Sequence, residues 1–501
     1  MLKSLRHMAR LIRVAFVLSR HDALIDLLSL FGEQPRALTR LRKLRKSKNN
    51  LVEAFQFLGP SFIKIGQAMS TRPDIVGPDV ALDLMRLQDK VPPFPGDEAI
   101  RIIEQELNRP LNQLFTDFDS NPVAAASIAQ VHFATTMDGR SVAVKVLRPG
   151  IEKAFSRDLE SFLWLARIVE RFSAKARRLK PTAVVETISE TITLELDLRY
   201  EAAAASELKD NSAGNDNYAV PDVDWDLTSR RVLCTSLVEG IPFAKKQEMV
   251  KAGYDLRKIA EGLVHSFLTQ ALGDGFFHAD LHQGNLFARP DNKITAIDFG
   301  IMGRIDKKTR RCLAEILYGF ITQDYDLIAK AHFDIGYVPE DQSLEKFKQA
   351  IRAIGAPIAG KPVKDISVGN LLAQLFETTE TFNMQTQPQL ILLQKTMVTV
   401  EGVALDLYPD INMWEASRPI IEKWMLDNLG PQAKIRDFAE TTLHMLNRIP
   451  KIADDLEVLA NAARKIQAAQ GQTPRHSALK LFLYGLAGGM AGSLILYYSL
   501  N

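Results

Sequence analysis

The stretch "HADLHQGNLF" occupies residues 278 to 287, and "IDFG" follows at residues 297 to 300. Asn285 lies five positions after Asp280, and Asp298 lies thirteen positions after Asn285. Amide and carboxylate oxygens are hard ligands of the kind that Mg²⁺ binds, and a further carboxylate can orient or deprotonate a hydroxyl group or water. The spacing therefore predicts a metal–phosphate site in which Asn285 and Asp298 hold the metal and Asp280 is catalytic.

A lysine upstream completes the pattern. Residues 131–136 and 141–147 are rich in β-forming residues on either side of Asp138-Gly139, which predicts a hairpin. Lys145 of "VAVK" then lies on the second strand, where its ammonium group can reach the phosphates of a nucleotide. Protein kinases arrange such a lysine, an Asp, an Asn and a DFG around ATP and Mg²⁺. Each motif is weak alone, but their order and spacing together indicate a kinase-like site for ATP with Mg²⁺ or Mn²⁺.

Two other kinds of site are disfavoured. His278 and His282 have the spacing of a helical zinc pair, but Gly284 follows them and the segment leads into a short strand, so we expect His278 to hydrogen-bond within the loop. Cys234 and Cys312 have no CxxC spacing, which argues against a zinc ribbon or a disulfide framework.

Composition and patterning suggest several units along the 501 residues. A hydrophobic content of 46% indicates a folded protein, and a net charge of only +2 gives no overall field for nucleic acid, which we exclude as a partner. We predict an α+β, atypical protein-kinase-like fold of two lobes. Its expected parts are basic N-terminal helices at 1–50, a helical extension at 51–122, a sheet-bearing lobe at 123–240, a helical lobe at 241–470 and a transmembrane helix at 478–500.

The segment expected over the phosphates departs from ordinary kinases. It reads "AAASIAQVH", residues 124 to 132, without the G-x-G-x-x-G whose glycines let backbone approach phosphate. Together with "KIGQAMSTRPD" at 64–74, "ELD" at 195–197 and "HADLHQGN", it resembles the UbiB family of atypical kinases, which support ubiquinone biosynthesis. The resemblance covers about residues 51 through 303.

The resemblance implies further roles. Lys64, Gly66 and Gln67 match the K-x-G-Q motif, which the family carries on a helix across the mouth of the active site, and Glu195 and Asp197 match its E-x-D. We assign these five a regulatory role. The remaining nucleotide-binding candidates are Ala124, Ala125, Ala126, Ser127, the hinge residues Leu237, Val238, Glu239 and Gly240, and Glu201, our choice to pair with Lys145.

Two functions follow from the resemblance. The first is a membrane-anchored ATPase or unorthodox kinase that promotes the handling of lipid-soluble quinone precursors and indirectly supports ring hydroxylation. The second is an idle nucleotide-binding scaffold for ubiquinone-biosynthesis enzymes. Retention of Lys145, Asp280, Asn285 and Asp298 favours the first. Direct hydroxylation is disfavoured, because no dinucleotide-binding glycine motif follows a strand and no iron-ligand triad is evident.

Both ends of the chain indicate a membrane. The apolar run Leu481–Leu500 meets the roughly 20 residues needed to span a bilayer, and its GxxxG spacings make a homodimer a candidate partner. The cations near the run precede it, which predicts a cytoplasmic body. In the family that the chain resembles, a C-terminal anchor is the bacterial pattern, so the resemblance implies a bacterial inner-membrane protein. The basic N-terminus and the cluster from Arg36 to Lys48 predict attraction to anionic lipid, with a mitochondrial presequence as the alternative for the N-terminus.

Overall fold

The structure is a computed structural model. It describes residues 2–21, 23, 50–70, 80, 83–84, 87, 91–172, 180–359, 374, 381–384 and 387–430. The chain divides into two compact units, Met1–Met425 and Leu426–Asn501. The lobes and the site described below lie in the first unit, apart from residues 426–429 of the last described helix.

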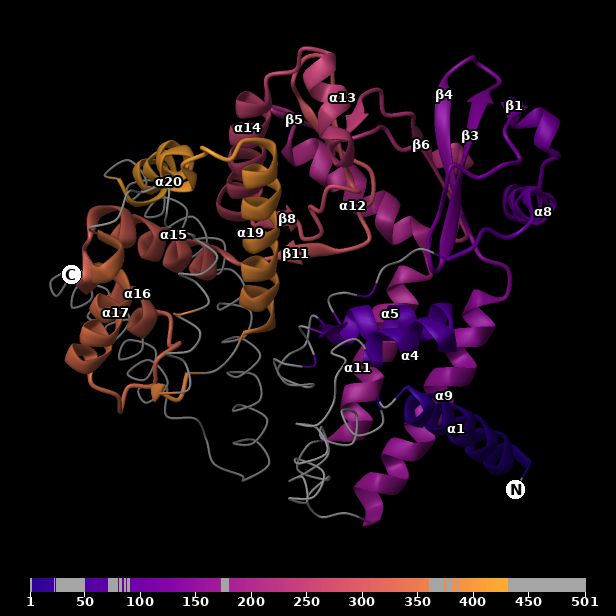
Figure 1. The fold of residues 1–501 in the computed structure, drawn as a ribbon, viewed down its shortest axis with the longest axis horizontal. Helices are drawn as coiled ribbons and strands as arrows, with labels where there is room; N and C mark the ends of the chain where they lie inside the picture. The colour runs from indigo at the N-terminus through magenta and orange to yellow at the C-terminus, as the bar shows by residue number, and fades with distance from the viewer. Residues whose placement is uncertain are drawn as a thin grey trace, which may run out of the picture. The chain divides into compact units, whose positions relative to one another are not determined.

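An antiparallel sheet forms the smaller lobe (Figure 1). Its strands are β1 (Phe115–Phe118), β2 (Ala124–Ala125), β3 (Ala129–Thr136), β4 (Ser141–Leu147) and β6 (Val232–Ser236). They lie in the order β1-β3-β4-β6, and β2 pairs with the first residues of β3. The hairpin predicted around Asp138-Gly139 is confirmed, and Gly139 takes φ +84°, which glycine reaches at no steric cost.

Helix α8 (Gly96–Leu107) covers one face of this sheet. Its Ala99, Ile102 and Ile103 pack with Val142 and Val144, whose alternation along β4 turns them to that face. The sheet therefore starts before the boundary expected at residue 123, and residues 96–118 belong with it rather than with the helical extension. The strand "FTDF" is a four-residue edge strand, too short to show a period of its own.

The larger lobe is mostly helical. Its helices are α13 (Lys246–Lys251), α14 (Leu256–Leu268), α15 (Lys307–Thr322), α16 (Tyr325–Asp334), α17 (Leu344–Ala359) and α19 (Pro388–Leu407). A further helix, α20 (Met413–Leu429), runs to the end of the described residues. Helices α14 and α19 lie side by side and share a large apolar core with the strands described next (Figure 1).

Short strands in this lobe bring the polar motifs together. They are β5 (Tyr218–Ala219), β7 (Ile241–Pro242), β8 (Phe276–His278), β9 (Leu286–Ala288), β10 (Ile294–Ala296) and β11 (Met302–Arg304). One sheet has the order β5-β10-β9-β7, and β8 pairs with β11. The sequence is strand-like in pattern at 285–288 and 294–297, and the structure forms β9 and β10 there. A π-helical turn, Thr269–Asp274, ends α14, and Gly275 at φ +70° leads the chain into β8.

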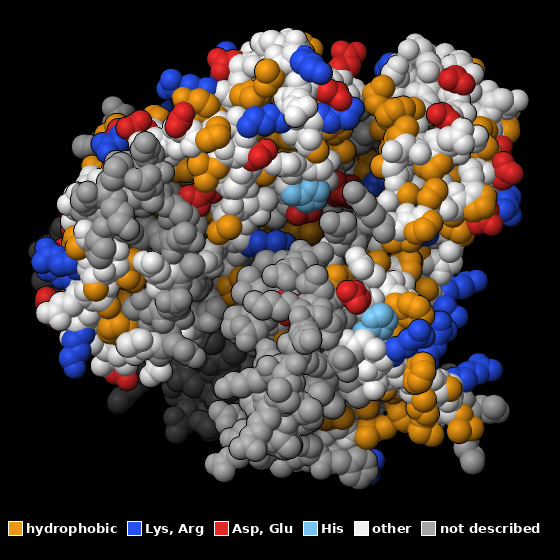
Figure 2. Space-filling model, viewed as in Figure 1, with side chains coloured by type: hydrophobic (Ala, Val, Ile, Leu, Met, Phe, Trp, Pro, Cys, Tyr) orange, Lys and Arg blue, Asp and Glu red, His pale blue; other side chains and the backbone are white. Residues whose placement is uncertain are grey.

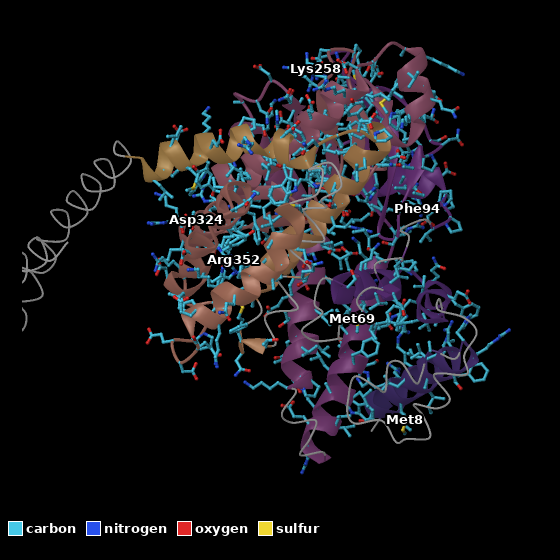
Figure 3. All side chains as sticks on the ribbon, turned by 60° about the vertical axis from the view of Figure 1, so that its left-hand side comes forward. Met8, Met69, Phe94, Lys258, Asp324 and Arg352 are labelled. Carbon is cyan, nitrogen blue, oxygen red and sulfur yellow. The ribbon has the colours of Figure 1, made fainter. Side chains whose placement is uncertain are left out.

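The remaining helices pack beside the smaller lobe. They are α1 (Leu2–Arg20), α4 (Asn50–Leu58), α5 (Pro60–Ser70), α9 (Ile151–Phe172), α11 (Pro181–Glu195) and α12 (Leu198–Asn211). Helix α5 contacts α4, α9 and α11, and α1 contacts α4 and α9. Pro60 begins α5, because proline suits the first turn of a helix. Phe62 and Ile65 are buried, while Met69, labelled in Figure 3, is half-buried.

Two predicted segments fall outside the described residues. These are the apolar run Leu481–Leu500 and the basic cluster from Arg36 to Lys48. Among the helices that the structure describes, none combines the length and apolar character needed to cross a membrane.

Candidate functional site

Lys145 on β4 contacts two carboxylates. Its Nζ donates to Glu201 Oε1 at 2.7 Å and to Asp298 Oδ2 at 3.2 Å. The Lys145 side chain is 15% exposed and that of Glu201 is 8% exposed, whereas Asp298 keeps 43% of its side-chain surface. The strand lysine, the helix acid and the DFG aspartate therefore meet at one place, with the aspartate on the open side.

Local structure explains why these side chains meet. Lys145 lies opposite Leu233 and Val131 in the middle of the sheet, so its backbone is held on both sides. Asp197 caps α12 by accepting a hydrogen bond from the Arg199 N–H, and Glu201 follows on the first turn of that helix. Capping contributes about 1 kcal/mol to a helix, and here it fixes the end that carries the acid.

Lys145 and Asp298 stabilise each other's charge, with Glu201 beside them. Burial alone would raise the pKa of Asp298, but the Lys145 charge, the Gly300 N–H and the Lys64 charge outweigh it and hold the pKa well below its usual range. Burial would also lower the pKa of Lys145, but Asp298 and Glu201 raise it above its usual range. Burial raises the pKa of Glu201, and the Lys145 charge opposes that change. Lys145 and Asp298 are consequently charged at neutral pH.

His278 joins the backbones of the segments that carry Asp280 and Asp298. Its Nε2 lies 2.5 Å from the Asp298 carbonyl oxygen, and its Nδ1 accepts the Asp280 N–H at 3.1 Å. Because Nδ1 accepts, the ring proton is on Nε2 and the imidazole is neutral. Burial lowers the pKa of His278, which agrees with that state. The histidine thus hydrogen-bonds within the loop, as the sequence indicated, rather than holding a metal.

Asn285 faces Asp280 across the turn that precedes β9. Its Nδ2 donates to the Asp280 carbonyl oxygen at 3.1 Å and to Asp280 Oδ2 at 3.3 Å. The Ile297 N–H donates to the Asn285 carbonyl oxygen at 3.1 Å, which brings Asn285 beside the residue that precedes Asp298. With its amide nitrogen engaged, Asn285 has its Oδ1 left to offer a cation.

The donor set fits a divalent cation held with a nucleotide. Among the described residues there is no cluster of three His, Cys, Asp or Glu side chains with the geometry of a metal site. Asp298 supplies an exposed carboxylate and Asn285 an amide oxygen. Mg²⁺ commonly takes one or two such protein ligands and completes its shell with phosphate and water.

Helix α5, which carries the K-x-G-Q motif, contacts α11, and α11 contacts α12, which carries Glu201. Lys64 Nζ on α5 lies 3.1 Å from Glu195 Oε2 at the end of α11, and both side chains are largely buried. The charge of Lys64 also lowers the pKa of Asp298. Gly66 has no room for a side chain, because a Cβ there would lie 2.3 Å from Leu87 Cδ1. Gln67 reaches the Leu87 carbonyl oxygen at 3.5 Å, so the motif combines one charged contact with close packing.

The alanine-rich loop is tied down by its own backbone. The Ala126 N–H donates to the Ala129 carbonyl oxygen at 2.8 Å, and Arg148 Nε donates to the Ala126 carbonyl oxygen at 2.9 Å. Ala124 and Ala125 form β2. Ser127 is fully buried, and its hydroxyl has no hydrogen-bond partner among the described residues.

The predicted hinge joins β6 to β7. Leu237, Val238, Glu239 and Gly240 form this connection, and the Leu237 N–H donates to the Ser141 carbonyl oxygen at 3.0 Å. Gly240 takes φ +156°, and a Cβ there would lie 2.5 Å from the Ala288 carbonyl oxygen. A side chain at this position would therefore push the hinge away from β9.

Several contacts at the site were not anticipated from the sequence. Thr396 Oγ1 on α19 lies 2.8 Å from the Leu392 carbonyl oxygen of its own helix and 3.2 Å from the Ala279 carbonyl oxygen, directly before Asp280, so its one proton is shared between the two. Gln283 Nε2 donates to Asp406 Oδ2 at 3.0 Å, so the same helix contacts the catalytic loop twice. Gln270, in the π-helical turn, accepts the His278 N–H at 3.1 Å.

A glutamine also holds the start of the smaller lobe. The Phe94 N–H donates to Gln130 Oε1 at 3.0 Å, and Gln130 Nε2 donates to the Phe94 carbonyl oxygen at 3.2 Å. The side-chain amide thus pairs with the backbone of Phe94 as a residue of a neighbouring strand would. Phe94 lies at this lobe in Figure 3, with Arg148 stacked over its ring at 5.7 Å. No local pattern in the sequence reports such pairings, because the partners are far apart along the chain.

Comparison with known proteins agrees with this architecture. The ABC1 atypical kinase-like domain matches residues 86–332, and the UbiB helical domain matches residues 351–412. Proteins named "Probable protein kinase UbiB" are similar over most of the chain. The one from Marinobacter nauticus is 41% identical over 88% of this chain and 83% of its own length. Those from Aliivibrio fischeri and Pseudomonas entomophila are each 40% identical, over 90% and 91% of this chain and 88% and 85% of their own lengths.

Among solved structures, the complex of Rv3197 with erythromycin from Mycobacterium tuberculosis has the same fold. It aligns with a TM-score of 0.54 and 23% identity, over 77% of this chain and 98% of its own. The kinase-like fold, the matched domains and the extended identity together show that the chain belongs to the UbiB family of ABC1 atypical kinase-like proteins.

Proposed function

We propose that this chain is an ATP-dependent phosphotransferase or ATPase that supports ubiquinone biosynthesis. The observation that carries the proposal is the contact of Lys145 with both Glu201 and Asp298, beside Asn285 and Asp280. A pseudoenzyme has no chemical need to keep this complete set. The alternative of an idle scaffold therefore has less support.

Each residue has a stated task in the proposed reaction. Lys145 holds the phosphates of the nucleotide, and Glu201 holds Lys145 in place. Asn285 and Asp298 would hold the divalent cation, which neutralises phosphate charge when bound. Asp280 accepts the proton of the attacking hydroxyl group or water. The oxygen of that group then forms a bond to the terminal phosphorus of ATP, and the bond between this phosphorus and the bridging oxygen of ADP breaks.

The proposed setting is the bacterial inner membrane, with one span at residues 478–500 and the catalytic unit on the cytoplasmic side. The proposed partners are anionic lipid, lipid-soluble quinone precursors and the enzymes that modify them. The support is the apolar run and the cations that precede it. The nucleotide cycle would serve the handling of these precursors and, indirectly, their ring hydroxylation.

A thermal-shift titration with Mg·ATP tests the nucleotide site. A ligand at a hundred times its Kd stabilises the folded protein by about 2.7 kcal/mol. Asp298→Asn replaces a charged ligand by a neutral one, so we expect at least a tenfold loss of affinity, about 1.4 kcal/mol. The matched control is Asp291→Asn in the exposed turn after β9, which should leave the shift unchanged.

Turnover then separates the two functions. The wild-type chain should release phosphate from Mg·ATP in the presence of a phenolic quinone-precursor mimic, and Asp280→Asn should bind nucleotide but release far less. Binding without turnover in the wild type would favour the scaffold. An equal thermal shift for wild type and Asp298→Asn would remove the metal assignment.

A further inference from the structure

Helix α1 is held in one orientation by polar contacts on its inner side. Arg10 forms an ion pair with Asp158 of α9, whose carboxylate is almost fully buried and also accepts the Ser61 hydroxyl of α5 at 2.7 Å. His7 Nδ1 lies 3.0 Å from the Ser161 hydroxyl. One buried carboxylate thus joins α1, α9 and α5, and the face that α1 turns outward is defined by this junction.

That outward face is apolar. Leu5, Met8, Ile12 and Phe16 are spaced by three or four residues, so they form one stripe along the helix. Their exposed fractions are 53, 46, 64 and 66%, although Val14 and Val17 on the same helix are buried. Exposed apolar residues scattered singly are ordinary, but four in a continuous stripe mark a surface that contacts something else.

A row of cations borders the stripe. Arg6, Arg13 and Arg20 are exposed and spaced by seven, which places them along one side of the apolar residues. Figure 2 shows basic and hydrophobic side chains next to one another at the lower right, where Figure 1 places α1. Met8 points away from the neighbouring helices in Figure 3.

The charge pattern selects the occupant. Helix α1 contains no acidic residue, so its outward face carries only positive charge. A second copy of the helix would bring no acidic side chain to pair with these arginines. An anionic lipid surface matches both features, because apolar side chains enter the acyl boundary while arginines remain among the headgroups.

We propose that the outer face of α1, formed by Leu5, Met8, Ile12 and Phe16 with Arg6, Arg13 and Arg20, docks on an anionic lipid surface. The inference rests on α1 and its packing, and it does not depend on the proposed nucleotide chemistry. It also does not require the predicted span at the other end of the chain.

A probe at one position tests this docking in the full-length chain. Cys234 and Cys312 are the two cysteines of the sequence and both are buried, so Ile12→Cys introduces the accessible thiol. A fluorophore there is reconstituted with vesicles of phosphatidylcholine, with or without phosphatidylglycerol, that contain a spin-labelled quencher lipid. Lys258→Cys, on the exposed side of α14, carries the control label.

We expect quenching at position 12 to be several-fold stronger than at position 258, and strongest with phosphatidylglycerol. Replacing Arg6, Arg13 and Arg20 by Gln should weaken the interaction by about fivefold per arginine. Replacing Lys245, Lys251 and Arg257, which are exposed on the larger lobe, by Gln removes the same charge away from α1 and should have no such effect.

Three outcomes would overturn the proposal: equal quenching at positions 12 and 258, no dependence on phosphatidylglycerol, or a spectral change at position 12 that follows protein concentration without vesicles. The last would assign the face to a second copy of the chain. Mg·ATP thermal shifts on the same samples report separately on the nucleotide site.

Discussion

At the scale of single residues, Asp298 matters for the charge of its side chain, whereas Gly66 matters because it has no side chain. Asp298 acts through its charge, which the Lys145 ammonium holds in place. Gly66 acts through the absence of a side chain, which lets α5 lie against Phe55 and Leu87. The motif therefore needs a glycine for reasons of packing, whereas its lysine makes the electrostatic contact with Glu195.

Gly66→Ala should destabilise the protein. The added Cβ would lie 2.3 Å from Leu87 Cδ1 and 2.7 Å from Phe55 Cδ2, so the helices must move apart, at a cost of about 1–3 kcal/mol. Gly402→Ala in α19 is the matched control, because nothing lies within 4 Å of its Cβ position and alanine favours helix by about 1 kcal/mol. Denaturant unfolding of both variants measures the difference. A Gly66→Ala variant as stable as the wild type would show that the two helices pack less closely.

At the scale of elements, α19 makes hydrogen bonds to the loop that carries Asp280. The Thr396 hydroxyl reaches the carbonyl oxygen of Ala279, and Asp406 near the end of the helix accepts from Gln283. The helix therefore holds the loop on both sides of Asp280. It lies within the part of the chain that matches the UbiB helical domain.

Thr396→Val keeps the side-chain shape and removes the hydroxyl. The buried Ala279 carbonyl then loses a donor, so we expect a loss of about 1–3 kcal/mol in stability and a fall in kcat that exceeds any change in KM. Thr399→Val on the same helix is the control, since its hydroxyl bonds only to the Lys395 carbonyl oxygen of its own helix. A proportional fall in kcat for both variants would argue against a positioning role.

The sequence allowed the hairpin, the α5 helix and the β9 and β10 pieces to be predicted, because each has a local signal. Asp138-Gly139 marks a turn, and Pro60 marks a helix start. The strands β9 and β10 flank the turn residues Pro290, Asp291 and Asn292. The strands β5, β7, β8 and β11 are as short but are not joined in pairs by such a turn, so they could not be foreseen. The contact between Thr396 and Ala279 spans 117 residues of sequence and leaves no local trace. The spacing of the motifs identified the candidate polar residues. The contacts between their atoms, such as those of Lys145 with Glu201 and Asp298, are seen only in the folded structure.

At the scale of the whole molecule, three buried histidines link folding to pH. Burial lowers the pKa of His332 to about 4 and lowers the pKa of His132 and His278 as well. Below the ordinary value of 6.5, the unfolded chain therefore binds more protons than the folded one. Stability should fall as pH drops below 6.5, by up to about 1.4 kcal/mol per pH unit for each histidine that remains neutral. Asp274 offsets part of this fall, because burial raises its pKa to about 6 and the folded chain takes up a proton there in the same range.

Urea unfolding at a series of pH values between about 7 and about 5 measures this effect. His332→Asn removes one of the three groups and should make the pH dependence less steep. The expected sign is proton uptake on unfolding. Proton release, or a free energy of unfolding that is constant over this range, would contradict the assignment of neutral buried imidazoles.

The arrangement around Lys145 affects which form of the nucleotide the site can bind. One ammonium group faces the Asp298 carboxylate and the Glu201 carboxyl group, so the site has no excess of positive charge, and the exposed carboxylate of Asp298 faces whatever enters. A nucleotide that arrives without a cation meets repulsion there, and a nucleotide that brings a cation meets an attractive site. If the proposed function holds, occupancy follows the concentration of the metal complex rather than that of total nucleotide. A cell depleted of magnesium would then lose this activity well before it ran short of ATP.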